Sequence, residues 1–250
     1  MRMNTNIKDA SPAETDAEYA RKLYNEAGKP WPDDDPWHTR THAFIQKYVT
    51  DALSDLCRPG SRILNAGAGD STYPLDGHFY NCDVAEKLIA GAENPIVASV
   101  ECLPCEDAYF DCAICVGSVL NYCRAEKAVP ELARTLKQGG ILVLHFERSH
   151  SAEFLFTRDY GKKTFIASYP YNGNDHRLHM YDENHIAGLL KDAACAVIRK
   201  KRFHSFSALV YRFNRRAEAG RHMDKDWLAR PADYWLASDV VFVCQKITRR

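Results

Sequence analysis

The chain has 250 residues, 46% of them hydrophobic, and its 33 basic residues balance its 33 acidic ones. This length suits one sizeable α/β domain, or one domain with a cap, and falls short of two full domains. The balanced charge provides no general attraction to nucleic acid or to a membrane surface. No run approaches the ~18 apolar residues of a membrane span, and Met1 to Ile7 lack the apolar segment of a signal peptide.

The first part of the chain predicts a polar start followed by two helices. Residues 1–15 are polar, and a helix is expected from Thr15 to Ala27, because Gly28 and Pro30 follow it. A second helix is expected from about Trp37 to Leu56, where apolar residues recur at close to a 3.6-residue period. The segment between the helices is rich in proline and tryptophan, so no regular structure is expected there.

Short apolar runs alternate with turns and helices in the middle of the chain. Expected strands are Arg62 to Ala66, His78 to Cys82, Ile96 to Val100, Phe110 to Val116 and Ile141 to Phe146, with a helix from Ala125 to Lys137. Continuously apolar strands are typical of sheets covered by helices on both faces. The pattern therefore predicts an α/β fold with a mainly parallel sheet.

The pattern changes after Phe146. Thr164 to Tyr169 and Arg177 to Tyr181 flank Asn172–Asp175, which indicates a hairpin. A helix follows to about Ala194, with Asp182 as its N-cap. The rest predicts a strand from Ala196 to His204, a mostly helical stretch over 205–238 and a last strand from Val240 to Lys246. Residues 150–181 and 205–238 are interpreted as insertions that cap the sheet.

A strand runs directly into a Gly-x-Gly turn at residues 63–70. Glycine is needed at Gly67 and Gly69 because the backbone turns sharply and must approach a ligand closely. Asp83 ends the next strand, where a carboxylate can accept hydrogen bonds from two ribose hydroxyls. A dinucleotide site would need a third glycine where Thr72 stands, and Pro74 interrupts the helix that would face a pyrophosphate. S-adenosylmethionine (SAM) has no phosphate, so these departures favour SAM.

The order of motifs resembles the class I SAM-dependent methyltransferases. After the glycine turn and Asp83 come Leu103-Pro104, the run Tyr109 to Cys115 and the run Leu136 to Leu144, which includes Gly139-Gly140. The resemblance implies a Rossmann-like fold, in which a seven-stranded, mostly parallel sheet has helices on both faces and an antiparallel last strand. It also implies SAM as cofactor, over a domain of residues 59–250. The implied cofactor-binding residues are Asn65, Ala66, Gly67, Ala68, Gly69, Asp83, Ser99, Val100, Glu101, Val116, Gly117 and Ser118.

The sequence departs from the family at three points. Asn65 replaces the usual aspartate, which removes a charge near the methionine ammonium of SAM. Ser99 replaces an aspartate, so that Ser99, the Val100 amide or Glu101 is expected to hold adenine. Pro74 shortens or removes the helix after the glycine turn. N-terminal segments of similar enzymes often cover the cofactor, so residues 1–58 are expected to form a helical lid; ordinary packing of their tryptophans against the sheet is the alternative.

Three residues are candidates for handling a proton or positioning the acceptor. Tyr122 follows the fourth strand, and Glu147 and His150 follow the fifth, at the edge where open α/β sheets bind ligands. Glu147 or His150 can take a proton from a hydroxyl or an amine. The alternatives are a salt bridge for Glu147 and a surface loop for His150. Alignment of an activated methyl group can lower the barrier by ~7–11 kcal/mol, so a base is not obligatory.

The cysteines do not predict a metal site. Cys112 and Cys115 lie in one expected strand, where an offset of three places them on opposite faces. Nine cysteines, an odd number mostly within apolar runs, favour reduced thiols and a cytoplasmic protein. We therefore expect no bound metal.

The predicted function is methyl transfer from SAM to an oxygen or nitrogen of a small molecule. The stretch from Arg199 to His222 holds eight Lys and Arg residues against the single acid Glu218, so the acceptor is expected to be anionic unless this stretch is a solvated face. A less favoured alternative is an RNA or nucleotide methyltransferase that uses the same stretch. A second alternative is a catalytically silent SAM-binding partner subunit. The oligomeric state stays open, and no contact with a membrane is expected.

Overall fold

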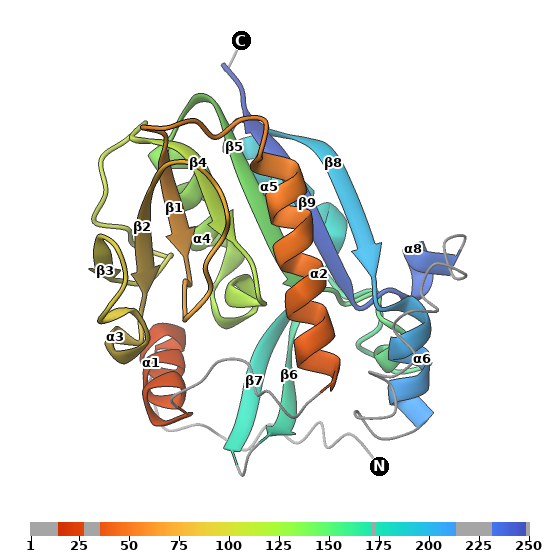
Figure 1. Ribbon diagram of the computed structural model, residues 1–250. Helices are drawn as coiled ribbons and strands as arrows, with labels where there is room; N and C mark the ends of the chain where they lie inside the picture. The colour runs from red at the N-terminus through yellow and green to blue at the C-terminus, as the bar shows by residue number, and fades with distance from the viewer. Residues whose placement is uncertain (1–14, 28–35, 172–173, 214–231, 249–250) are drawn as a thin grey trace.

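The computed structural model describes residues 15–27, 36–171, 174–213 and 232–248 (Figure 1). The first half contains α1 (Asp16–Ala27), α2 (Pro36–Leu53), β1 (Arg62–Ala66), β2 (His78–Asp83), α3 (Glu86–Ile89), β3 (Pro95–Val97), β4 (Phe110–Cys115), η1 (Val119–Tyr122) and α4 (Ala125–Thr135). The second half contains β5 (Leu136–Glu147), η2 (Ala152–Phe154), β6 (Thr164–Tyr171), β7 (Asn174–Tyr181), α5 (Glu183–Asp192), β8 (Cys195–Phe203), α6 (Ser205–Phe213), α8 (Asp233–Leu236) and β9 (Asp239–Lys246).

Seven strands form one sheet in the order β3-β2-β1-β4-β5-β9-β8. The pairs from β3 to β5 are parallel, whereas β9 is antiparallel to both β5 and β8. The predicted Rossmann-like sheet with an antiparallel last strand is therefore confirmed. The chain order reverses between β1 and β4, and open α/β sheets bind ligands at the carboxyl ends of strands at such a switch point.

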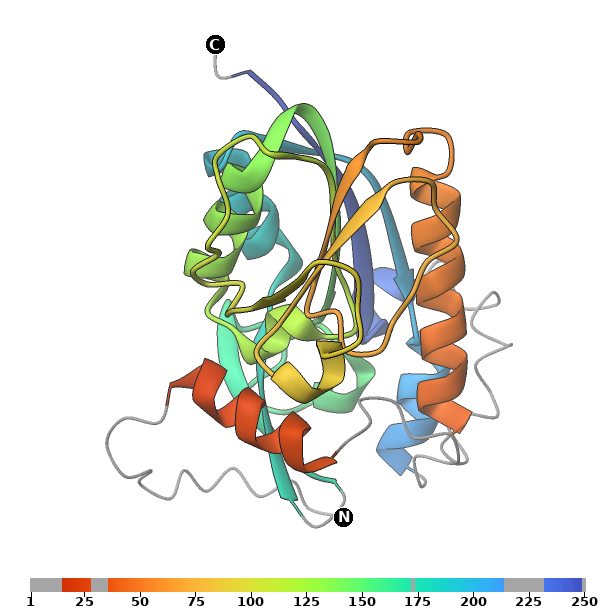
Figure 2. The same cartoon turned by 60° about the vertical axis from the view of Figure 1, so that its left-hand side comes forward.

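Helices cover both faces of the sheet. In Figure 2, α2 lies on one side of the sheet and α4 and α5 lie on the other. The α2 side is an apolar cluster that includes Val49, Leu53 and Cys112, and the α4 side is a second cluster that includes Leu132 and Cys115. Cys112 and Cys115 thus face opposite sides of β4, as their odd spacing predicts.

Several expected boundaries differ from the structure, and the second helix, for example, ends at Leu53 instead of Leu56. The helix at 125 ends at Thr135, and β5 begins directly at Leu136, where Leu136 pairs with Phe110 before the register shifts. The third strand ends at Val97, because the Cys102 N–H donates to the Ser99 carbonyl at 3.0 Å and turns the chain out of the sheet. Ser99 and Val100 therefore follow the third strand rather than end it.

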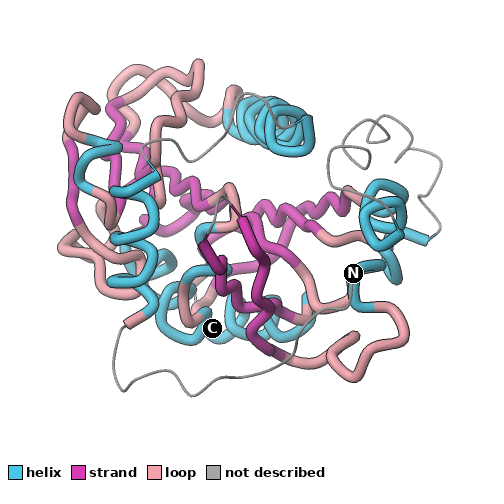
Figure 3. Tube along the Cα trace, turned by 90° about the horizontal axis from the view of Figure 1, so that it is seen from below, coloured by secondary structure: helices cyan, strands magenta, loops and turns pink. Residues whose placement is uncertain are grey.

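No helix separates β1 from β2, as Pro74 predicts. The antiparallel hairpin β6–β7 is confirmed, and its strands extend to Tyr171 and Asn174 around residues 172–173, which lie outside the described residues. Seen from below, the hairpin lies across the centre of the sheet edge (Figure 3). The mostly helical prediction for 205–238 holds at α6 and α8; the residues between them, 214–231, and the aromatic segment 28–35 are not described.

Within the described ranges, no helix is long and apolar enough to cross a membrane.

Candidate active site

A cavity opens at the carboxyl ends of β1, β2, β4 and β5, directly at the switch point of the sheet. The turn after β1, the end of β2 and the turn after β4 line one side of it, and α1, α2 and the β6–β7 hairpin line the other. Nine of the predicted cofactor residues line it: Gly67, Ala68, Gly69, Asp83, Ser99, Val100, Val116, Gly117 and Ser118. Asn65, Ala66 and Glu101 do not.

The glycine turn brings bare backbone to the cavity wall. Gly67 has a φ of +69°, a left-handed conformation that favours glycine. A Cβ on Gly67 would lie 2.1 Å from Cγ2 of Val119, so no side chain fits there. The N–H groups of Gly67 and Ala68 both donate to the Cys82 carbonyl, at 2.7 and 2.9 Å, which ties the turn to β2.

Asp83 presents its carboxylate beside this turn. Its Oδ2 accepts from the Gly69 N–H at 2.9 Å, and its Oδ1 accepts from the Ala85 N–H at 2.8 Å. Burial raises the pKa of Asp83 above its ordinary value, although these backbone donors counteract part of the effect. Each carboxylate oxygen has lone-pair capacity beyond its one backbone donor, and Asp83 lines the cavity.

Asn65 and Glu101 have structural roles that correct two expected contacts. The Asn65 side chain donates to the Ser71 carbonyl at 3.1 Å and to Oδ1 of Asn81 at 3.0 Å, so it fixes the glycine turn from behind. Oε1 of Glu101 accepts from the backbone N–H of Arg124, the N-cap of α4, at 2.6 Å. Glu101 therefore caps a helix, whereas Ser99 and Val100 line the cavity.

A hydrogen-bonded chain links two further carboxylates of the cavity wall, Glu147 and Asp239. The Ser118 N–H donates to Nδ1 of His145 at 3.0 Å, and Nε2 of His145 lies 2.9 Å from Oδ1 of Asp239. Because Nδ1 accepts, Nε2 carries the proton and donates to Asp239. The Ser118 hydroxyl donates to Oε1 of Glu147 at 2.8 Å. His145 is thus a hydrogen-bonded core histidine.

Asp239 is a cavity residue that sequence reasoning missed. It stands directly before the last apolar strand, and its partner across the β5–β9 ladder is Glu147. Burial raises the pKa of Asp239, but His204 and His145 lower it more, so it lies below the ordinary value. The only sequence signal for Asp239 was its position as an acid directly before the last predicted strand. The strand pairing that brings it to Glu147 joins residues far apart in the sequence.

Tyr122 lies at the aromatic end of the cavity. Its hydroxyl is 2.9 Å from Nδ1 of His176, and the ring of Tyr24 meets its ring edge-on at 5.5 Å. Burial raises the pKa of Tyr122 well above its ordinary value, so the hydroxyl stays protonated at neutral pH. The group can orient a ligand by hydrogen bonding, but it is not a base.

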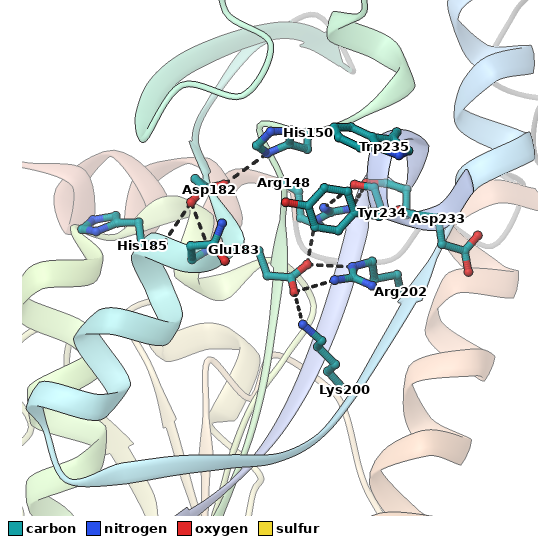
Figure 4. Close-up of polar contacts among 12 residues, drawn as sticks. Arg148, His150, Asp182, Glu183, His185, Lys200, Arg202, Asp233, Tyr234 and Trp235 are labelled. Carbon is teal, nitrogen blue, oxygen red and sulfur yellow. Dashed lines mark hydrogen bonds and ion pairs between the residues drawn. The ribbon is translucent and has the colours of Figure 1, made fainter. Parts of the chain in front are cut away.

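His150 is not a cavity residue, which corrects its assignment as a catalytic candidate. Its Nδ1 lies 3.1 Å from Oδ2 of Asp182 (Figure 4). The chain turns away from the cavity after Glu147, since the Arg148 N–H donates to the Ser238 carbonyl and the Ser149 N–H to that of Tyr181. Of the three candidates, Tyr122 and Glu147 remain in the cavity wall.

No described Lys or Arg of the basic stretch lines the cavity, although Arg212 donates to the carbonyl of Glu153, which does line it. Lys200 and Arg202, on the edge strand β8, bind the carboxylate of Glu183 at 2.6 and 2.7 Å (Figure 4). The Arg199 guanidinium lies over the ring of Tyr48, 5.6 Å from its centroid. Arg215, Arg216 and Arg221 lie outside the described residues. The prediction of an anionic acceptor therefore gains no support from these side chains.

Arg148 completes the same ion-pair cluster. Its Nε lies 3.4 Å from Oε2 of Glu183, and its terminal nitrogens donate to the carbonyls of Asp233, Tyr234 and Ala237. These carbonyls precede Ser238 and Asp239, so Arg148 fixes the segment that leads into the cavity wall. No group of three His, Cys, Asp or Glu side chains within the described residues is arranged to hold a metal ion.

Residues 61–144 match a protein family described as a methyltransferase domain. Over 128 residues the chain is 31% identical to the ubiquinone/menaquinone biosynthesis C-methyltransferase of Vibrio cholerae, and 30% identical to that of Yersinia pestis. The alignments cover 43% of this chain and 48% and 50% of those proteins. The chain thus spans about half the length of the curated relatives it matches.

Solved methyltransferases share the fold over nearly the whole chain. The geranyl diphosphate C-methyltransferase of Streptomyces coelicolor superposes with a TM-score of 0.61 at 10% identity, covering 95% of this chain and 100% of that one. The magnesium protoporphyrin IX methyltransferase of Synechocystis, solved with bound SAM, gives a TM-score of 0.58 at 14% identity with the same coverage. At these identities the likeness shows the fold.

Proposed function

We propose that this chain, whose residues 61–144 form a methyltransferase domain of the class I SAM-dependent kind, transfers a methyl group from SAM to a small molecule. One observation carries the proposal: the bare turn at Gly67 and the carboxylate of Asp83 meet at one cavity at the switch point. SAM is a nucleoside that carries a methionine chain, and it needs a close backbone approach for that chain and a hydroxyl acceptor for its ribose.

The residues present fit SAM. The turn at Gly67 leaves room where a Cβ would clash, and the Asp83 oxygens can accept from ribose hydroxyls in addition to their backbone donors. Ser99 and Val100 line the adenine side, and the turn at Ser118 lines the side nearest Glu147. When bound, SAM supplies an already activated methyl group, so the protein has to align the acceptor and exclude water.

The cavity supports a small acceptor rather than a large one. Side chains from several layers close around it: Tyr24 from α1, Trp37 and Thr41 from α2, and His176 and Leu178 from β7. We propose that α1 and α2, from the expected lid over residues 1–58, and β7, from the expected cap over 150–181, form these walls. The RNA alternative depends on the basic stretch, and three of its members, Arg199, Lys200 and Arg202, contact Tyr48 or Glu183 outside the cavity.

We expect S-adenosylhomocysteine (SAH) and SAM to raise the melting temperature of the protein. A ligand present at 100 times its dissociation constant stabilises the folded state by about 2.7 kcal/mol. Differential scanning fluorimetry with increasing ligand measures the shift. Absence of stabilisation by either ligand at millimolar concentration would contradict the proposed function.

Replacing Asp83 with asparagine is expected to weaken SAH binding by about 10-fold to 100-fold. An asparagine has one acceptor oxygen, so its NH₂ must face either a backbone N–H or a ribose hydroxyl, and one hydrogen bond is lost. A hydrogen bond to a charged group contributes about 1.5–3 kcal/mol. Calorimetric titration of SAH measures the affinity. Asp70→Asn is the matched control, because Asp70 lies just beyond the turn but does not line the cavity. Equal affinities of the two variants would refute the role of Asp83.

A further inference from the structure

The side chains that line the cavity include several acidic ones and no lysine or arginine among the described residues. The acidic ones are Asp83, Glu147, Glu153 and Asp239. Asp83 lies at the proposed ribose position. Glu147 and Asp239 are linked to Ser118, directly and through His145, and Glu153 accepts from the Tyr169 hydroxyl. The proposed function leaves this part of the cavity for the acceptor. A cavity of this composition concentrates cations and repels anions.

Glu147 and Asp239 form the centre of this acidic end. They are direct partners across the antiparallel β5–β9 pair, so their side chains lie on the same face of the sheet. Like charges directly opposite one another in a sheet are destabilising. Glu147 accepts from the Ser118 hydroxyl and Asp239 accepts from the His145 ring, and His204 also lowers the pKa of Asp239 electrostatically. The Ser238 hydroxyl also donates to Asp239. A ligand cation placed between the two carboxylates would be attracted to both of them.

Aromatic side chains lie at the same end. Tyr24, Trp37, Tyr122 and Tyr169 all line the cavity, from α1, α2, η1 and β6. Aromatic faces attract ammonium groups, most strongly when water is excluded. Carboxylates and aromatic rings together are the pattern by which proteins recognise organic ammonium ions.

Building on the proposed function, we propose that the methyl acceptor is an organic amine that enters as its ammonium ion and is held by Glu147 and Asp239. Glu147 takes one proton from the ammonium, which frees the nitrogen lone pair, while Asp239 remains ionised and holds the nitrogen in place. The nitrogen then forms a bond to the methyl carbon as the carbon–sulfur bond breaks, and the electron pair of that bond goes to sulfur. The positive charge passes to the methylated ammonium, and Glu147 releases its proton to water.

The test compares three ligands of matched size on the protein saturated with SAH. Phenethylamine, 2-phenylethanol and phenylacetate are titrated by calorimetry at pH 7. We expect phenethylamine to bind about 10-fold to 100-fold more tightly than the alcohol, and phenylacetate most weakly, because a hydrogen bond to a charged group contributes about 1.5–3 kcal/mol. The same series is repeated with Glu147→Gln and Asp239→Asn, each of which should remove most of the preference for the amine.

Glu93→Gln is the control, since Glu93 is an exposed carboxylate outside the cavity. The amine assignment is overturned if the alcohol or phenylacetate binds as tightly as the amine, or if none of the three binds. In either case, binding of SAH would leave the proposed methyl transfer supported. A preference for the amine that survives both substitutions overturns the assignment to Glu147 and Asp239. Failure of SAH itself to bind refutes the proposed function instead. The ligand series on the unmodified protein decides the question even where a variant does not fold.

Discussion

A Gly67→Ala protein is expected to bind SAH at least about 100-fold more weakly than the unmodified chain. The new Cβ would lie 2.1 Å from Val119 Cγ2, and the φ of +69° adds strain of about 1–2 kcal/mol for any residue with a side chain. Overpacking of this kind costs about 1–3 kcal/mol more. The turn has to move to relieve the clash, and it carries the Gly69 N–H that holds Asp83. Calorimetric titration of SAH measures the loss.

Gly139→Ala separates the clash from the backbone strain. Gly139 also has a positive φ, +80°, but a Cβ there meets nothing within 4 Å. This control should lose stability by the strain alone and should bind SAH as the unmodified protein does. If Gly67→Ala binds SAH with unchanged affinity, the turn is not the cofactor cradle, and the proposed function loses its main support.

The sheet and the cofactor side of the cavity were predictable because local signals determine them. The run of residues 62–66 is apolar and ends in glycine, so both the strand and the turn follow from short-range preferences. Asp83 was predictable for the same reason, as the polar residue at the end of the next strand. Pro74 was predicted to shorten or remove the helix after the turn, and no helix lies between β1 and β2.

The acceptor side was not predictable because long-range pairing determines it. Glu147 and Asp239 are 92 positions apart, and only the antiparallel register of β9 places them opposite each other. His150 is three residues beyond Glu147, yet the chain turns away between them and His150 pairs with Asp182. A single sequence contains no signal for that turn, because it depends on the backbone partners Ser238 and Tyr181.

The partners of the basic stretch were not predictable from the local sequence either. Its charge density indicated a surface for an anion, but Lys200 and Arg202, on strand β8, compensate one buried acid at the start of helix α5. Glu183 has 5% of its side chain exposed and sits at the start of α5, between these two cations and Arg148. Arg148 in turn holds the three carbonyls before Ser238. The cluster thus supports the cavity wall from outside the cavity.

Glu183→Gln is expected to destabilise the protein by about 3–5 kcal/mol at neutral pH, because removing one partner of a buried ion pair leaves the others uncompensated. Burial raises the pKa of Glu183, but Arg202 and Lys200 lower it more, so it lies below its ordinary value. The stabilisation from this carboxylate is therefore complete above the ordinary pKa and is lost as the pH falls through the lowered one. Urea denaturation at several pH values should show the variant's deficit shrinking on acidification.

Glu126→Gln is the matched control for this prediction. Glu126 also occupies the first turn of its helix, α4, so both substitutions remove the same favourable interaction with a helix N-terminus. Glu126 differs in being half exposed, with His185 as its partner at 2.9 Å, and an exposed pair contributes at most about 1 kcal/mol. A deficit of Glu183→Gln no larger than that of Glu126→Gln would mean that the buried cluster does not hold the segment before Ser238. The position of Asp239 in the cavity wall would then have to depend on the β5–β9 ladder alone.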